Sequence, residues 1–337
     1  MLDLIESKYM SDNKSKPLDW GTMAANLTLD VVTELGFSHC MGNIKHDRDL
    51  YDYHGSISPG LPVVQVLNVY PSLVSLLEQM QRTPLLNKLL PGPEDKDGYG
   101  RLVGFAKQRA IERFEPNAKN PNDMLASFAR QGMTKEEAEA NAAVQMTAGT
   151  DPGATALRVA ILYISTNTRV HRRLLSELSS SDLLTAPPTS SIVSLKRCRQ
   201  LPYLQACVKE TLRIFPPFCG LSSKAVPSGG DYLDGKFVPE GTSVGFCYWA
   251  AMRDTDVFGE DADIFRPERW LEATEEARNR MERSLECVFS PGRYTCLGKD
   301  LAVLQVNKVI VEVSGRCALR LIGVMLICVL CIVLQTI

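Results

Sequence analysis

A long helical stretch at residues 134–168 constrains the fold of this chain more than any other feature. It begins with Thr134 and Glu137, which form the Ser/Thr-x-x-Glu pattern of a capping box at a helix N-terminus. Its central part, residues 138–160, is rich in Ala and other small residues. Because small side chains leave the helix backbone accessible, another group can approach this helix closely.

Pro152 and Gly153 stand in the middle of this stretch. A proline there has no N–H to donate to the carbonyl of Ala148, and its ring presses against the preceding turn. Two interpretations remain open. The stretch is either broken into two helices at this point, or it is one kinked helix with a freed carbonyl that can hold water or a ligand.

The rest of the chain is predicted to be mainly α (α+β), with a small β region. Turn signals such as Gly229-Gly230 and Asp234-Gly235 separate short strands between residues 222 and 248. Helices before these strands and one helix after them suit this class better than alternating βαβ units. Further helices are expected at 18–36, 70–80, 100–114, 121–130, 201–214 and 297–313, and Gly36 is expected to end the first of them. A surface loop is expected at 179–194.

Composition excludes several classes of protein. The chain has 37 Lys and Arg against 39 Asp and Glu, with 45% apolar residues, which argues against disorder and against a nucleic-acid binder that relies on a basic surface. Residues 1–10 include Asp3, Glu6 and Lys8, so no secretory signal is recognised there. The ten cysteines are therefore expected to be reduced thiols.

One cysteine stands in a distinctive segment directly before the last predicted helix. The segment Phe289-Ser-Pro-Gly292-Arg293-Tyr-Thr-Cys296-Leu-Gly298 follows the pattern F-x-x-G-x-x-x-C-x-G. A single cysteine is usually a buried apolar thiol. Four fixed positions around one cysteine argue against that interpretation here.

This pattern resembles the signature of the cytochrome P450 superfamily of haem-thiolate monooxygenases. The resemblance implies a partial cytochrome P450 fold, a haem cofactor, and Cys296 as the thiolate ligand of the haem iron. It also implies that Gly292 and Gly298 let the backbone approach the flat macrocycle, and that Phe289 shields the sulfur from water.

Two basic residues are expected beside the haem under the same resemblance. Arg293 stands three positions before Cys296, whereas the commoner basic position is two before it, where this chain has Tyr294. Lys224 falls where many members have an arginine that binds a haem propionate. A lysine keeps the charge and loses the bidentate fork of arginine.

A second resemblance lies in an ionic pair behind the haem. Glu210 and Arg213 form an E-x-x-R pair, and their spacing places both on one helix face. Such pairs are usually solvated salt bridges. The downstream segment Phe265-Arg-Pro-Glu-Arg269-Trp resembles the family's P-E-R-F segment, which implies that Glu210, Arg213 and Arg269 form a structural ionic cluster.

A third resemblance concerns oxygen activation. The segment Ala148-Gly-Thr-Asp151-Pro152-Gly is similar to the family's [AG]-G-x-[DE]-T-[TS] segment, in which an acid and an alcohol deliver protons to dioxygen. Asp151 supplies the acid, and Pro152 stands where the alcohol is expected. Thr155 and Thr150 are the candidate substitutes. This departure predicts impaired proton delivery and impaired activity.

The two ends of the chain differ from the usual family pattern. The resemblance runs from about residue 19 to residue 313, without the N-terminal anchor, first sheet and early helices, so a truncated product or a shortened relative is expected. We expect residues 1–315 to form a partial P450 catalytic domain and 316–337 to form an apolar tail. Residues 321–337 carry no charge, which fits either a short membrane-spanning helix or a buried strand or core helix.

The function that follows from the resemblance is haem-thiolate oxidation of a small organic substrate with molecular oxygen. Electrons would come from an NADPH-dependent P450 reductase, and the site would be the endoplasmic reticulum membrane. Several segments of the sequence are similar to those of fungal family members that act in secondary metabolism, such as the pisatin demethylase group. The alternatives are a truncated, non-catalytic remnant with a membrane-anchoring tail, and a haem protein with isomerase or dehydratase chemistry.

Overall fold

The computed structural model describes residues 1–10, 16–57, 98–115, 122–181, 192–219 and 221–316, with a few single positions between 60 and 95. The tail beyond residue 316, most of the helix expected at 70–80 and most of the loop expected at 179–194 lie outside these residues. In the described part, no helix has the length and apolar character that crossing a membrane requires.

Helix α10, Lys135–Thr166, is the central element of the fold. The Thr134 side chain accepts from the Glu137 backbone N–H, and the Glu137 carboxylate accepts from the Thr134 backbone N–H, as the capping box predicts. The helix continues through Pro152, so the interpretation of a break at that residue is wrong. It ends instead at Asn167, whose side chain caps the next helix, α11, Thr168–Ser180.

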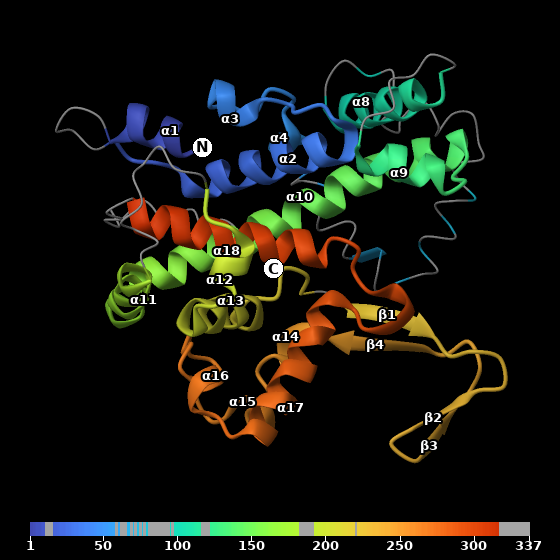
Figure 1. Cartoon of the computed structure of the whole chain (residues 1–337). Coiled ribbons are helices and arrows are strands. Elements are labelled where there is room, and N and C mark those ends of the chain that lie inside the picture. The colour runs from blue at the N-terminus through green and yellow to red at the C-terminus, as the bar shows by residue number, and fades with distance from the viewer. Residues whose placement is uncertain are drawn as a thin grey trace.

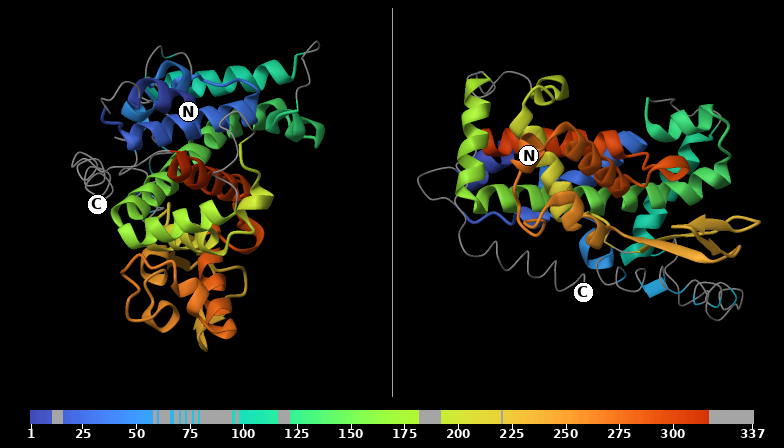
Figure 2. Two further views of the ribbon diagram at one scale, coloured as in Figure 1. Left: turned by 60° about the vertical axis from the view of Figure 1, so that its left-hand side comes forward. Right: turned by 90° about the horizontal axis from the view of Figure 1, so that it is seen from below.

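Helices on both sides of α10 cover it along its length. In Figure 1, α2 (Trp20–Phe37), α8 (Gly98–Arg113) and α9 (Met124–Arg130) lie above it. Helix α18 (Lys299–Arg316) runs beside it, as the second view of Figure 2 shows most clearly. Helix α13 (Pro202–Ile214) packs below it.

Small residues allow these close crossings, as the sequence predicts. A Cβ added to Gly149 would stand 2.8 Å from Val32 of α2, and one added to Gly153 would stand 3.1 Å from Thr28. Gly153 also faces Gln305 of α18, at 3.3 Å. The glycines of the Ala148–Gly153 segment are therefore needed for helix packing.

Two apolar clusters form the core. One lies between α2, α8, α9 and the first half of α10, and includes Leu29, Leu102 and Met146. The larger one lies between the second half of α10 and the helices α11, α13 and α18. Because α10 contributes to both clusters, it joins the two halves of the molecule.

Apart from the helix expected at 70–80, which lies mostly outside the described residues, the expected helices are confirmed in position, with small differences at their ends. Helix α2 runs one residue past Gly36 and ends at Ser38, which takes the left-handed conformation, so Gly36 is not the stop. Helices α11 and α17 (Glu275–Glu286) were not predicted. The shorter helices are α1 (Leu2–Leu4), η1 (Ile5–Tyr9), α3 (Asn43–His46), α4 (Tyr53–Ile57), α12 (Leu195–Cys198), α14 (Tyr248–Ala251), α15 (Thr255–Phe258), α16 (Arg269–Glu272), η3 (Cys287–Phe289) and η4 (Gly292–Tyr294).

Four short strands form the small β region that the sequence predicts. Strands β1 (Leu221–Ala225) and β4 (Ser243–Cys247) pair in antiparallel fashion, as do β2 (Asp231–Leu233) and β3 (Lys236–Val238). The β2–β3 hairpin projects from the body of the molecule in Figure 1. Gly235 in its turn has a φ of 71°, a conformation that favours glycine.

Candidate haem site

The segment around Cys296 forms a compact loop between α17 and α18, which we call the Cys296 loop, residues 287–298. The backbone N–H of Cys296 donates to the carbonyl of Phe289 over 2.8 Å and closes the loop. Gly292 has a φ of 83°, so glycine suits the turn at this position. The predicted turn role of Gly292 is therefore consistent with the backbone of the loop.

Cys296 lies just before the N-terminus of α18. The N–H of Lys299 donates to the Cys296 carbonyl over 3.3 Å, and the N–H of Ala302 donates to the Gly298 carbonyl over 2.8 Å, which starts the helix. The thiol is free and exposed. The sulfur therefore lies near a helix N-terminus, where free backbone N–H groups favour negative charge.

Gly298 lies close to the sulfur. A Cβ added to it would stand 3.8 Å from Cys296 Sγ, in ordinary contact distance. Glycine therefore leaves one side of the sulfur uncovered. Phe289 is partly buried against the larger core cluster, and its described contact with Cys296 is through its backbone carbonyl. Shielding of the sulfur by the Phe289 ring stays a prediction.

Two cations converge on the Cys296 loop. Lys224 comes from β1, opposite Val244 of β4, and its ammonium lies 5.0 Å from the centre of the Tyr294 ring. The guanidinium carbon of Arg293 lies 6.0 Å from the same ring. The fold thus brings together two basic residues separated by about seventy positions in the sequence. Both are exposed and could bind carboxylates of a ligand beside Cys296.

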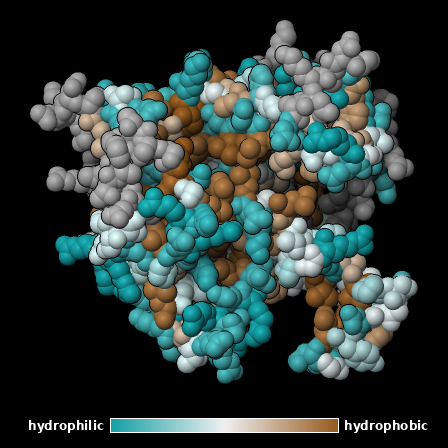
Figure 3. Space-filling view, in the orientation of Figure 1, coloured by the Kyte–Doolittle hydropathy of each residue, from teal (hydrophilic) through white to brown (hydrophobic). Residues whose placement is uncertain are grey.

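Apolar side chains are exposed around Cys296 and on α10. Leu297 is 89% exposed and Tyr294 is 65% exposed. On α10, Val144 is 61% exposed, and Ala148 follows one turn later on the same accessible face. Figure 3 shows apolar side chains over α18 and α10 in the middle of one face of the molecule. An uncovered sulfur, two cations and an uncovered apolar stripe fit a flat apolar group with anionic substituents.

Glu210 stands at the centre of the predicted ionic cluster. Its carboxylate accepts five hydrogen bonds: two from Arg213 (2.9 and 2.8 Å), one from Arg269 (3.1 Å), one from the Trp270 indole (2.9 Å) and one from the Arg266 backbone N–H (2.8 Å). Glu210 and Arg213 are both completely buried. The prediction that Glu210, Arg213 and Arg269 meet is confirmed by this geometry.

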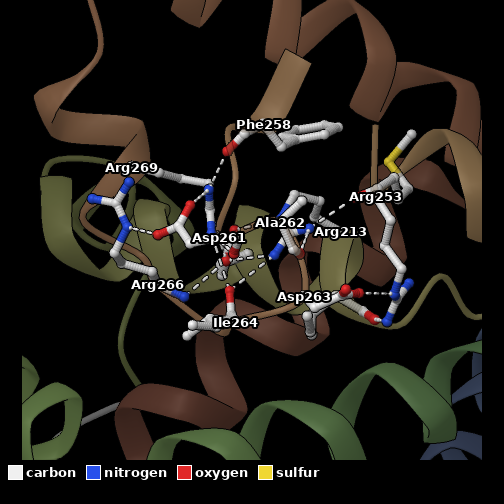
Figure 4. Close-up of polar contacts among 12 residues, drawn as sticks. Arg213, Arg253, Phe258, Asp261, Ala262, Asp263, Ile264, Arg266 and Arg269 are labelled. Atoms are coloured by element: carbon white, nitrogen blue, oxygen red, sulfur yellow. Dashed lines mark hydrogen bonds and ion pairs between the residues drawn. The ribbon is translucent and has the colours of Figure 1, made fainter. Parts of the chain in front are cut away.

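The remaining donors of the two arginines bind backbone carbonyls. Arg213 donates to the carbonyls of Met252 (2.7 Å), Ala262 (2.6 Å) and Ile264 (3.2 Å). Arg269 donates to the carbonyls of Phe258, Asp261 and Ile264 and to the Asp261 carboxylate. Figure 4 shows both guanidinium groups directed at the segment 258–264. Every N–H of both side chains is therefore bonded, which two buried charges require.

A second buried carboxylate, Glu268, lies beside this cluster. Its Oε1 accepts from Tyr203 (2.8 Å) and pairs with Arg169 (2.5 Å) and Arg173 (3.4 Å) of α11. Burial works to raise the pKa of Glu268, but the hydrogen bonds from Arg169 and Tyr203 outweigh burial and lower it. The segment 266–270 is thus joined to α11 as well as to α13.

The ionic cluster connects to the Cys296 loop through α17. Lys209, which precedes Glu210 on α13, forms a 2.5 Å ion pair with Glu282 of α17. Helix α17 leads directly into η3 and the Cys296 loop. At the loop, the Tyr248 hydroxyl lies 3.2 Å from the Ser290 hydroxyl. The cluster therefore orders the scaffold from which the loop extends.

The predicted acid, Asp151, is half-buried on α10. Burial raises the pKa of its carboxyl, and the Tyr53 hydroxyl, 3.3 Å from Asp151 Oδ2, acts against that rise. The hydroxyl of Thr150 donates back to the Met146 carbonyl over 2.7 Å within the helix, and it also lies beside the Tyr53 hydroxyl. Thr155 is half-buried one turn after Asp151. Its substitution for the missing alcohol stays a prediction.

Several functional residues were not found from the sequence. Tyr53 and Tyr203 lie 98 and 65 positions from their partners Asp151 and Glu268. Asp261 lies only eight positions from Arg269, but nothing in its local sequence marks it as a partner. Trp270 could have been found, because it follows Arg269 directly and a buried indole N–H needs an acceptor. That acceptor is Glu210.

Comparison with known proteins agrees with this geometry. A family model described as cytochrome P450 matches residues 2–321. The chain is 37% identical over 320 residues to "Cytochrome P450 monooxygenase ABA1" of Pyricularia oryzae. The matched region covers 94% of this chain and 62% of that protein. It is 35% identical over 327 residues to "Cytochrome P450 monooxygenase aba1" of Botryotinia fuckeliana, covering 96% of this chain and 63% of that protein.

A more distant relative has the same description. The chain is 33% identical over 322 residues to "Cytochrome P450 monooxygenase mpaDE" of Penicillium roqueforti, covering 92% of this chain and 36% of that protein. The chain therefore spans less than two thirds of the length of these curated relatives.

Proposed function

The chain belongs to the cytochrome P450 family, and on that premise we propose that it is a haem-thiolate monooxygenase of small organic molecules. The observation that carries the proposal is the exposed Cys296 thiol at the start of α18, held in a closed loop and flanked by uncovered apolar side chains. A buried structural cysteine would not be presented in this way.

The described residues fit a haem group in chemistry and placement. Cys296 would ligate the iron, while Lys224 and Arg293 would pair with the propionates. The accessible face of α10 at Val144 and Ala148 would lie against the macrocycle. When bound, a thiolate-ligated haem supplies the activation of dioxygen, because the thiolate pushes electron density that favours O–O cleavage.

The chain itself orients the Cys296 side chain. The Phe289 carbonyl fixes the Cys296 backbone, and the N-terminus of α18 favours negative charge on the sulfur. The Glu210 cluster fixes the segment 252–269 against α13, so the scaffold around the loop does not depend on a ligand. Asp151, half-buried on α10, is the proposed proton carrier.

The reaction also requires partners that the family supplies. We propose molecular oxygen as co-substrate, and an NADPH-dependent P450 reductase as electron donor. The endoplasmic reticulum membrane is the proposed location, with residues 316–337 as a candidate anchor. The three relatives described as cytochrome P450 monooxygenases come from fungi, and we propose a role in fungal secondary metabolism.

Pro152 favours a second candidate function. Because α10 has no alcohol next to Asp151 on the expected face, the chain could bind haem and yet activate oxygen poorly, as a non-catalytic remnant would. Substrate oxidation that requires both NADPH and oxygen would exclude this candidate. Peroxide production without product would favour it.

The carbon-monoxide difference spectrum of the reduced, haem-loaded chain tests the proposal. We expect the long-wavelength Soret band of a thiolate ligand in the parent chain and its loss in Cys296→Ser. The matched control is Cys40→Ser, because Cys40 is also an exposed free thiol but lies between α2 and α3. An unchanged band in Cys296→Ser would contradict the proposal.

A further inference from the structure

Tyr53 provides a hydroxyl group at the middle of α10. It lies on α4, and its side chain is completely buried in the cluster between α2, α8 and α10. Its hydroxyl donates to Asp151 Oδ2 over 3.3 Å. Among the residues that the structure describes, no other side chain forms a hydrogen bond with the Asp151 carboxylate.

The hydroxyl groups of α10 itself do not replace this contact. Pro152 has none, and the Thr150 hydroxyl is bonded to the Met146 carbonyl. Thr155 lies one turn further along α10 and has no described bond to Asp151. The acid–hydroxyl pair that the sequence of α10 lacks is therefore formed between α10 and α4.

The position of Asp151 joins a buried region to an accessible one. Tyr53 approaches it from the core, and its neighbours Ala148 and Pro152 lie on the exposed and half-exposed side of the helix. Burial raises the pKa of the Asp151 carboxyl, which favours a group that carries a proton.

We propose, as an extension of the monooxygenase function, that Tyr53 is the positioning residue that holds Asp151 for proton delivery. Because the Tyr53 O–H occupies Oδ2, the proton carried by Asp151 resides on Oδ1. When the reduction of dioxygen consumes that proton, the O–H bond at Oδ1 breaks and Asp151 becomes a carboxylate. The Tyr53 O–H stabilises this carboxylate until water returns a proton to Oδ1.

The hydrogen bond itself can be tested by infrared spectroscopy without haem. The carboxylic C=O band of Asp151 is identified on acidification as the band that Asp151→Asn removes. A C=O group that loses a hydrogen bond absorbs at higher frequency, so Tyr53→Phe should shift this band upward. Tyr51→Phe is the matched control, because it removes a hydroxyl from the same segment, and Tyr51 packs instead against Phe105. An unshifted band in Tyr53→Phe overturns the proposal.

The functional consequence is measured with the haem-loaded chain and a reductase. Tyr53→Phe should raise the ratio of peroxide to oxidised product several-fold and retain the thiolate Soret band. Asp151→Ala breaks the same contact from the other residue and should give the same change. Tyr51→Phe, the matched control, should leave the ratio near that of the parent chain.

The outcomes separate this inference from the function on which it rests. Absence of the thiolate band in the parent chain refutes the monooxygenase function, whereas the infrared shift still decides the Tyr53–Asp151 contact. A normal band with an unchanged peroxide ratio in Tyr53→Phe overturns the positioning role alone. A larger rise in Thr155→Val than in Tyr53→Phe overturns it in favour of Thr155.

Discussion

The Glu210 cluster and the Cys296 loop are both recognised from short sequence motifs, yet their structures differ. Glu210 and Arg213 are completely buried, and all their bonding groups are matched by protein partners. In the Cys296 loop, Leu297 is 89% exposed and the thiol has open surroundings. The polar groups of Glu210 and Arg213 are bonded within the protein, whereas the Cys296 loop exposes its thiol and the Leu297 side chain.

The difference follows from the physics of burial. A buried charge without partners is strongly unfavourable, so a buried ion cluster must satisfy all its groups within the protein. An exposed thiol and an exposed leucine are hydrated, so the fold does not require a protein partner for either of them. This chain therefore stabilises its scaffold through internal partners, whereas the Cys296 loop keeps its thiol and the Leu297 side chain at the surface.

Of the substitutions that test this comparison, Glu210→Gln should cause the largest loss of folding stability. The substitution leaves the buried Arg213 guanidinium without a compensating charge and leaves Arg269 with Asp261 alone, so we expect destabilisation of about 3–5 kcal/mol. Urea unfolding followed by circular dichroism measures it. Glu282→Gln is the control, because it removes a partly exposed partner of Lys209 and should change stability by at most about 1 kcal/mol. Similar effects of both variants would show that the cluster does not stabilise the scaffold.

Glu268→Gln should cause an intermediate loss of folding stability, and the size of this loss should depend on pH. The pKa of Glu268 is lowered from its ordinary value of 4.5 by Arg169 and Tyr203, which outweigh burial. Its ionised form therefore stabilises the fold fully above pH 4.5, and this contribution is lost as the pH falls through the lower pKa of the folded state. We expect the stability difference between parent and variant to be largest at pH 7 and to shrink below pH 4.5.

The control for this pH series is Glu275→Gln, on the first turn of α17. Glu275 is exposed, so its variant should follow the parent at each pH. A constant difference between parent and Glu268→Gln across the range would contradict the assigned role of the ionised carboxylate.

Leu297→Ser should have the smallest effect on stability and a clear effect on ligand binding. Because Leu297 is 89% exposed, unfolding should change by no more than about 0.5 kcal/mol. Haem retention in a competition with apomyoglobin should nevertheless fall, since the side chain is expected to pack against the macrocycle. Loss of stability with normal haem retention would indicate that Leu297 supports the fold instead.

The motif residues could be predicted because their chemistry is local. The capping box at Thr134 and Glu137 predicts where α10 begins, and the structure confirms it. The E-x-x-R pair and the P-E-R segment predict a meeting of Glu210, Arg213 and Arg269 through their resemblance to the cytochrome P450 family, and the three side chains do meet. The strands between 222 and 248 follow from turn residues that the backbone requires.

Other features depended on contacts between distant segments. The continuity of α10 through Pro152 is one such feature. Packing of α10 against α2 and α18 keeps the helix continuous although Pro152 cannot donate a backbone hydrogen bond. The contact of Tyr53 with Asp151 joins residues 98 positions apart. Nothing in the sequence near either residue indicates which hydroxyl the acid binds.

The sequence by itself determined the family, the cysteine and the ionic residues, because these groups have chemical requirements that short patterns express. Only the tertiary structure decided how they are completed: which carbonyls satisfy Arg213, which cations converge on Tyr294, and which hydroxyl reaches Asp151. The physical reason is that hydrogen bonds and packing act over a few ångströms in space, whereas the partners are separated by tens of residues along the chain.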